Sequence, residues 1–315
     1  MFTNYVRDTK CNLEKAIKDE NIDAVELLLT NQKIDPSVNN NSAITIASKE
    51  GYLKIVELLL TDPRVDPTEI DNRAIRWASY NGHAEIVKLL LEDSRVDPTA
   101  GDDYAIREAA ANGHVEVVKL LLEDPRIDPA SMDNWAIAYA VENGHIEVVK
   151  LLLEDPRVNP SSFDNYAIKI AACNRHTKIV KLLLDDQRVD PSAADNYAIT
   201  TAAGNGHTEI VKLLLDDKRV DPSGNNNYSI IWASKNGYID VVRLLLADPR
   251  VDPSVDDNEA IKCAFQNEHI DIVNLLLEDE RVDSSSIRNY SIETNSEIHM
   301  NIIKLLVAEN LMADE

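Results

Sequence analysis

Seven histidines share one position of a 31-residue pattern, and they are the first residues whose type and spacing could do chemistry. They are His83, His114, His145, His176, His207, His269 and His299. A row of imidazoles could hold zinc, but zinc needs its ligands at about 2 Å. Packed helical layers would place successive histidines about 10 Å apart. The spacing therefore predicts structural histidines, with no metal site and no cofactor.

A second row is basic and lies in the loops of the same pattern. Its nine members each precede the Asp (or Asn) of a loop by two residues, and they are Lys33, Arg64, Arg95, Arg126, Arg157, Arg188, Arg219, Arg250 and Arg281. One interpretation is a ladder that binds phosphates. The other is an Arg–Asp network between neighbouring loops, which the excess of acidic residues in these loops favours.

Catalytic motifs are absent from the sequence. It has no glycine-rich phosphate loop, no Cys-x-x-Cys pair and no nucleophile elbow. Carboxylates are abundant, but they recur with the repeat, as solvated helix faces do. We therefore expect no enzymatic activity.

The elements that position these rows follow from an Asp-Pro dipeptide with a fixed spacing. It runs from Asp35-Pro36 to Asp252-Pro253 in steps of 31 residues or a multiple, and Asn159-Pro160 keeps the spacing. A period of this length is typical of a solenoid, in which each unit buries its apolar face against its neighbours. Such an array presents a long surface, which favours recognition over catalysis.

One unit, residues 133–160, shows the expected local structure. A short helix of small apolar residues ends at Asn143-Gly144, where glycine can adopt a left-handed conformation. A second helix with a broad apolar stripe follows and ends before Pro156, which cannot continue it. The unit is therefore a helix, a tight turn, a second helix and a projecting loop.

The order Ala-Ile, small residues, Asn-Gly-His, Val-Val-Lys-Leu-Leu-Leu resembles the ankyrin repeat. The family's usual period is 33 residues, and the short Asp-Pro-rich form resembles arrays of large DNA viruses and protists. The family's Thr-Pro-Leu-His opening reads Tyr-Ala-Ile here, so we expect the preceding Asn or Asp to cap the helix. The resemblance implies an all-α repeat solenoid of about ten helix-turn-helix units with projecting loops or short hairpins, curved with a concave inner face.

We expect a single array over residues 1–315. Its parts would be an N-terminal capping repeat (1–35), eight regular repeats (36–283) and a C-terminal capping repeat (284–315). Both end repeats are unusually polar, as repeats that face water on one side must be.

Composition narrows the class of partner. The net charge is −23, which argues against nucleic acids and anionic membranes. No apolar stretch approaches the roughly 20 residues of a membrane span, and the first residues are too polar for a secretory signal. Three widely separated cysteines, Cys11, Cys173 and Cys263, fit a reducing compartment. We expect a monomeric protein of the cytoplasm, or of the nucleus.

Two positions on the first helix vary from unit to unit, which marks them as free from packing. In the ankyrin family, these positions and the loop tips line the concave face that binds partners. The resulting candidates are Trp77, Tyr80, Glu108, Tyr139, Glu142, Ile170, Thr201, Trp232 and Lys235. The tips vary as well, with Ile70, Gly101, Met132, Phe163, Ala194 and Asn225 at equivalent places.

A ladder of aromatic residues lies on the same side, at Tyr104, Trp135, Tyr166, Tyr197 and Tyr228. It either packs loop on loop or binds a partner, because Tyr and Trp are frequent binding anchors. The predicted function is a non-enzymatic scaffold that binds a protein along the concave face. The alternative is an adaptor that recruits substrates to machinery such as a ubiquitin ligase. Some ankyrin proteins do this through an appended C-terminal module, and we expect none here because the sequence ends directly after the last expected helix.

Overall fold

The computed structural model describes residues 12–283 together with residues 285, 287 and 303. The expected C-terminal capping repeat, including His299, therefore lies almost wholly outside the described residues. The described chain is helical and contains no strand, which confirms the predicted all-α repeat fold. Its loops form no hairpin of strands.

The chain divides into two compact units, Met1–Pro160 and Ser161–Glu315. The helices of the first unit are α1 (Asn12–Lys18), α2 (Ile22–Thr30), α3 (Val38–Glu50), α4 (Leu53–Thr61), α5 (Glu69–Tyr80), α6 (Ala84–Glu92), α7 (Ala100–Ala111), α8 (Val115–Glu123), α9 (Ser131–Glu142) and α10 (Ile146–Glu154). Those of the second are α11 (Ser162–Cys173), α12 (Thr177–Asp185), α13 (Ala193–Gly204), α14 (Thr208–Asp216), α15 (Gly224–Lys235), α16 (Ile239–Leu246), α17 (Val255–Gln266) and α18 (Ile270–Leu277). A single array with a concave face stays a prediction.

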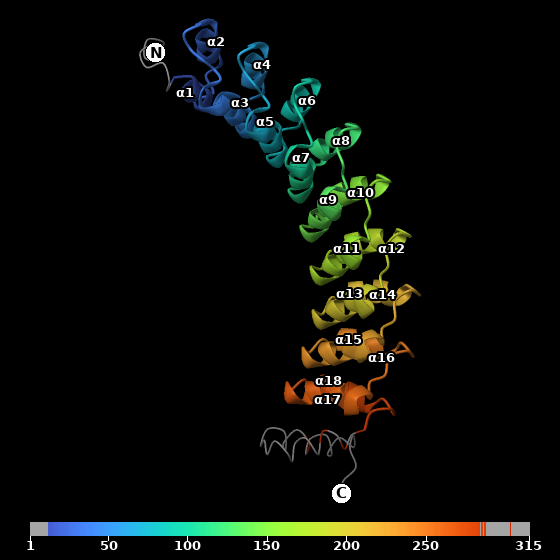
Figure 1. Ribbon diagram of the computed structural model, residues 1–315. Helices are drawn as coiled ribbons and strands as arrows, with labels where there is room; N and C mark the ends of the chain where they lie inside the picture. Colours follow the sequence, from blue (N-terminus) through green and yellow to red (C-terminus); the bar gives the residue numbers. More distant parts are fainter. Residues whose placement is uncertain (1–11, 284, 286, 288–302, 304–315) are drawn as a thin grey trace. The chain divides into compact units, whose positions relative to one another are not determined.

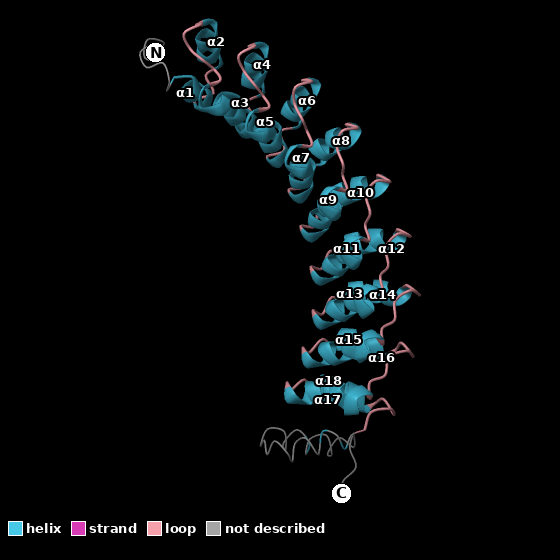
Figure 2. Cartoon of the chain, viewed as in Figure 1, coloured by secondary structure: helices cyan, strands magenta, loops and turns pink. Residues whose placement is uncertain are grey.

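Within each unit, the helices form two rows (Figure 1). Within a unit, each odd-numbered helix packs against the next odd-numbered helix of that unit and against the even-numbered helix that follows it in the chain. Loops connect each even-numbered helix to the next pair (Figure 2). We call the odd-numbered helices the inner helices and the even-numbered ones the outer helices. The inner surface is the exposed side of the inner helices together with the loop tips that lead into them.

The core of each pair is built from small residues on the inner helix and larger ones on the outer helix. Ala105 and Ala109 of α7 are fully buried, as are Val118 and Leu121 of α8. The small alanines let neighbouring inner helices approach closely, while the valine and leucine side chains fill the layer between the two rows. Burying each of these larger side chains stabilises the fold by about 1.5–3 kcal/mol.

In six of the nine described turns between paired helices, the residue with positive φ is a glycine, as the sequence predicts, whereas Glu20, Arg175 and Glu268 take this conformation at the other three. Gly82 has a φ of 80°, and a Cβ placed there would lie 2.5 Å from Nδ1 of His114 in the next repeat. The ring of His114 also places Nε2 2.9 Å from the carbonyl oxygen of Tyr80. Where the sequence has both residues, the glycine of one turn and the histidine of the next repeat therefore pack together and lock the two turns in place.

The loop tips take a conformation that the sequence does not predict. Three successive residues at each tip have left-handed φ and ψ, for example Ile70, Asp71 and Asn72 in α5. Asn and Asp tolerate this region better than other side chains, which explains the recurring Asp-Asn pair. The buried Asn72 places Oδ1 2.8 Å from the backbone amide of Asp97, which donates to it. The prediction that this side chain caps its own helix is therefore wrong, because Asn72 accepts a hydrogen bond from the following loop instead.

The Asp of each Asp-Pro pair organises its own loop. Oδ1 of Asp66 accepts hydrogen bonds from the backbone amide of Thr68 at 2.9 Å and from its hydroxyl at 2.7 Å. The amide of Asp66 donates to Oδ1 of Asn41 at 2.8 Å. The 31-residue spacing of Asp-Pro thus reflects a hydrogen bond from each loop to the preceding tip, repeated along the chain.

Candidate partner-binding surface

None of the nine predicted binding residues is buried, and all lie on inner helices. The first unit holds Trp77 and Tyr80 on α5, Glu108 on α7, and Tyr139 and Glu142 on α9. The second holds Ile170 on α11, Thr201 on α13, and Trp232 and Lys235 on α15. The structure therefore brings them to two inner surfaces, one for each unit, and their binding role stays a prediction.

Two aromatic pairs on the inner surface of the first unit pack edge to face. The ring centroids of Trp77 and Tyr80 are 5.5 Å apart, and those of Trp135 and Tyr139 are 5.3 Å apart. Nζ of Lys49 lies 5.3 Å from the Trp77 ring, at a distance that allows a cation–π contact. Tyr80 remains 37% exposed, so this pair offers aromatic surface that is already oriented.

Two arginines outside the predicted set lie against the rings of the aromatic ladder in this unit. The guanidinium carbon of Arg76 lies 4.5 Å from the centroid of Tyr104. That of Arg107 lies 5.8 Å from Tyr104 and 5.6 Å from Trp135. Part of the ladder is therefore held by stacked arginines of two repeats. The varied position directly after the Ala-Ile pair was the signal that could have found them.

These arginines also brace the strained tips. Nη1 of Arg76 lies 3.1 Å from Oδ2 of Asp71, and Nε of Arg107 donates to the carbonyl of Asp102 at 2.8 Å. Lys169 repeats the contact in the second unit, with Nζ 3.0 Å from Oδ2 of Asp164. A basic side chain directly after the Ala-Ile pair thus holds the loop tip that lies five residues earlier in the chain.

Three tips carry large apolar side chains in the left-handed region. Ile70, Met132 and Phe163 have φ of 51° and are 42%, 43% and 50% exposed. Left-handed backbone costs such residues about 1–2 kcal/mol, and an exposed side chain regains little of that by packing. Strain of this kind concentrates at functional sites. These tips belong with the candidate surface.

The inner surface of the second unit centres on Trp232, which is 48% exposed. One side of its indole covers Gly204, where an added Cβ would lie 3.3 Å from Cε3 of the ring. Nζ of Lys235 lies 6.0 Å from the same ring. The cysteine at the equivalent position, Cys263, is buried, and burial raises the pKa of its thiol to about 11. Cys263 therefore offers no exposed thiol to a partner.

A family comparison identifies the repeat. A family model described as ankyrin repeats in three copies matches residues 75–164, 106–195, 139–226, 168–257 and 199–288. These overlapping matches cover more than half of the chain. The chain belongs to the ankyrin repeat family. No curated protein matches it.

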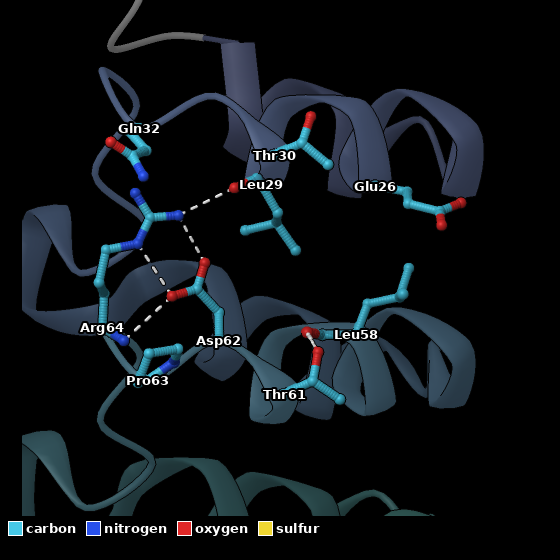
Figure 3. A pocket seen from close by; sticks show the side chains of 9 residues that line it. All are labelled: Glu26, Leu29, Thr30, Gln32, Leu58, Thr61, Asp62, Pro63 and Arg64. Atoms are coloured by element: carbon cyan, nitrogen blue, oxygen red, sulfur yellow. Dashed lines mark hydrogen bonds and ion pairs between the residues drawn. The ribbon is translucent and has the colours of Figure 1, made fainter.

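The arginine row of this ankyrin protein forms a network, although not the one expected. Arg64 pairs with Asp62 of its own loop and reaches the carbonyl oxygen of Leu29 with Nη2 at 3.0 Å (Figure 3). Its Nη1 donates to the carbonyl oxygen of Ile34 at 2.7 Å. The link between neighbouring repeats is thus Arg to carbonyl rather than Arg to Asp. The cavity beside Arg64 measures about 720 Å³ and lies between the ends of α2 and α4. A phosphate there would have to displace bonds that already occupy the guanidinium.

In five of the described ankyrin repeats the histidine ring lies against a backbone carbonyl oxygen of the preceding repeat, at 2.9–3.1 Å from Nε2; these residues are His83, His114, His145, His207 and His269. In the described residues, no three side chains of the types that bind metals come together. None of the helices in this part of the chain combines the length and apolarity that crossing a membrane requires.

Proposed function

We propose that this ankyrin repeat protein is a non-enzymatic scaffold that binds a protein partner on its inner surface. The observation that carries the proposal is the coincidence of three properties on the inner helices. Side chains there vary from repeat to repeat, they include exposed aromatic groups, and they stand on helices with fully buried faces. Ankyrin repeats generally mediate protein–protein interaction, which supports the assignment.

The energetic argument concerns Trp77, Tyr80, Tyr139 and Trp232. Tyr and Trp supply much of the binding energy in interfaces because they bury large surfaces and lose little side-chain freedom. Here Trp77 and Tyr139 are already held by an aromatic neighbour. A partner would therefore meet anchors whose orientation is set before binding.

Substitution of these anchors tests the proposal. The full chain would capture its partner from the cells in which it occurs, and affinity would then be measured for Trp77→Ala and Tyr139→Ala. We expect each substitution to weaken binding at least about tenfold, the usual effect of truncating an aromatic anchor. Trp232→Ala applies the same test to the second unit.

Leu27→Ala is the matched control, since Leu27 is 54% exposed but lies on the outer helix α2. It should leave binding unchanged, and thermal unfolding should show that all four variants stay folded. If the folded inner-surface variants bind the partner as tightly as the wild type, the proposal is wrong.

A further inference from the structure

A groove on the inner surface of the first unit joins two hollows near the loop tips. One hollow, of about 240 Å³, lies between α3 and α5 and is lined by Ile46 and Lys49 among others. The second, of about 230 Å³, lies between α5 and α7 and reaches Tyr104. Both include Ile70, Arg73 and Trp77, so the two hollows are continuous across these side chains.

The charge of this groove is opposite to that of the protein. The chain has 55 acidic and 32 basic residues. The described residues that line the two hollows nevertheless include Lys49, Arg73 and Arg76 and not one Asp or Glu. A cluster of cations in a strongly acidic chain gives a local field that attracts carboxylates.

The three cations have capacity for a further partner. Arg73 is exposed and has no ion-pair partner among the described residues. Nζ of Lys49 lies 3.7 Å from Oε1 of Glu50, with both side chains 47% exposed, which is a weak surface pair. Arg76 is committed to Asp71 through Nη1, but its buried Nε has no hydrogen-bond acceptor.

Apolar surface lies between these charges. Ile70 is 42% exposed despite its left-handed backbone, and the indole of Trp77 forms the part of the groove that both hollows share. An aliphatic or aromatic side chain inserted between Ile70 and Trp77 would exclude water from both.

We propose that this groove binds an acidic peptide segment of the partner. An apolar side chain of that segment lies between Ile70 and Trp77, and flanking Asp or Glu carboxylates pair with Arg73 and Lys49. The inference rests on the proposed function and names the chemistry of the partner. Guanidinium–carboxylate pairs of this kind are charge-assisted and directional, and they set the register of the bound segment.

A selection of random linear peptides displayed on phage, carried out on the full chain at low ionic strength, tests the inference. The peptides recovered should carry Asp or Glu next to an apolar residue. Their affinity, measured by fluorescence anisotropy, should fall at least about tenfold in Arg73→Glu, because a pairing becomes a repulsion. It should also weaken as salt is added, since exposed charge pairs are screened.

Lys88→Glu is the matched charge reversal, because Lys88 is exposed on the outer helix α6 of the same repeat. It should leave the affinity within about twofold, the range of a distant surface charge. Recovered peptides that need Trp77 but carry no acidic residues, or that ignore Arg73→Glu, would overturn the acidic-segment inference and leave the proposed function standing. Peptides that bind equally well to Trp77→Ala and Arg73→Glu would overturn the inference, because they bind outside this groove, whereas the proposed function fails only if the captured partner also ignores Trp77→Ala, Tyr139→Ala and Trp232→Ala. Recovery of no peptide would overturn the inference alone, since a folded partner could still bind.

Discussion

Replacing Gly82 with Ala should lower the free energy of unfolding by about 3 kcal/mol. Of this, about 1 kcal/mol comes from placing a Cβ on a left-handed residue. The rest comes from the ring of His114, which would lie 2.5 Å from the new Cβ and must give up its hydrogen bond to the carbonyl of Tyr80. Urea unfolding followed by circular dichroism measures the change.

Two further variants separate these contributions. Gly101 is also left-handed, with a φ of 68°, but its nearest neighbours would lie 3.4 Å from an added Cβ. Gly101→Ala should therefore cost only about 1 kcal/mol. In a His114→Ala background, Gly82→Ala should also cost only about 1 kcal/mol, because the clash between the new Cβ and the imidazole ring is gone. Equal costs for Gly82→Ala in both backgrounds would refute the lock between the glycine and the histidine.

Acid should destabilise this protein mainly by protonating the Asp of an Asp–Arg pair that recurs in its loops. Hydrogen bonds from the arginine two residues later hold the pKa of an Asp below its ordinary value of 3.8 in eight described loops. The residues are Asp62, Asp93, Asp124, Asp155, Asp186, Asp217, Asp248 and Asp279. A carboxylate with a lowered pKa in the folded state contributes stability above its ordinary pKa and loses that contribution as the pH falls through the lowered one. The urea midpoint should drop steeply below about pH 4.

Two variants, one expected to lower the stability at pH 7 and one expected to raise it, separate the effect of these carboxylates from the titration of other groups. Asp124→Asn breaks the pair with Arg126 and should be less stable than the wild type at pH 7. Asp103 is the exception among the loop tips, because burial raises its pKa where other tips carry Asn. Asp103→Asn keeps the acceptor for the amide of Asp128 and removes a buried charge, so it should gain about 1 kcal/mol at pH 7.

Both differences should vanish as the pH falls. Below the ordinary pKa and, for Asp124, below the lowered pKa of the folded state as well, the wild-type carboxyl is protonated in the folded and the unfolded chain, and it resembles the neutral amide. The difference at Asp103 closes first, since its raised pKa lets it protonate at higher pH. A difference that persists undiminished at pH 3 for either variant would show that its cause is packing rather than ionisation.

Local structure follows from the sequence because its causes lie within a few residues. Gly144 adopts a φ of 77°, and α10 ends at Glu154, just before Pro156, as glycine and proline chemistry predict. The small apolar residues of α9 and the stripe of α10 are buried because their spacing matches a helix.

Side-chain partners 25 to 35 residues away could not be predicted in the same way. Asn72 bonds to the amide of Asp97, and Arg126 reaches the carbonyl of Val96. Both partners depend on the rise and rotation between repeats, which the pattern of one repeat does not contain. The stacked Arg76 and Arg107 were missed for the same reason. The exposure of the candidate residues on the inner helices was easier to predict, because positions that are free from packing vary along a single chain, and their binding role stays a prediction.

Hydrogen–deuterium exchange of the full chain, free and bound to its captured partner, would locate the binding surface. We expect slower exchange at the tips and in inner helices, including Glu69–Tyr80 and Ala100–Ala111, with the outer helices Ala84–Glu92 and Val115–Glu123 unchanged. Protection confined to the outer helices would refute binding on the inner surface, because the partner would then bind a surface whose side chains repeat the framework.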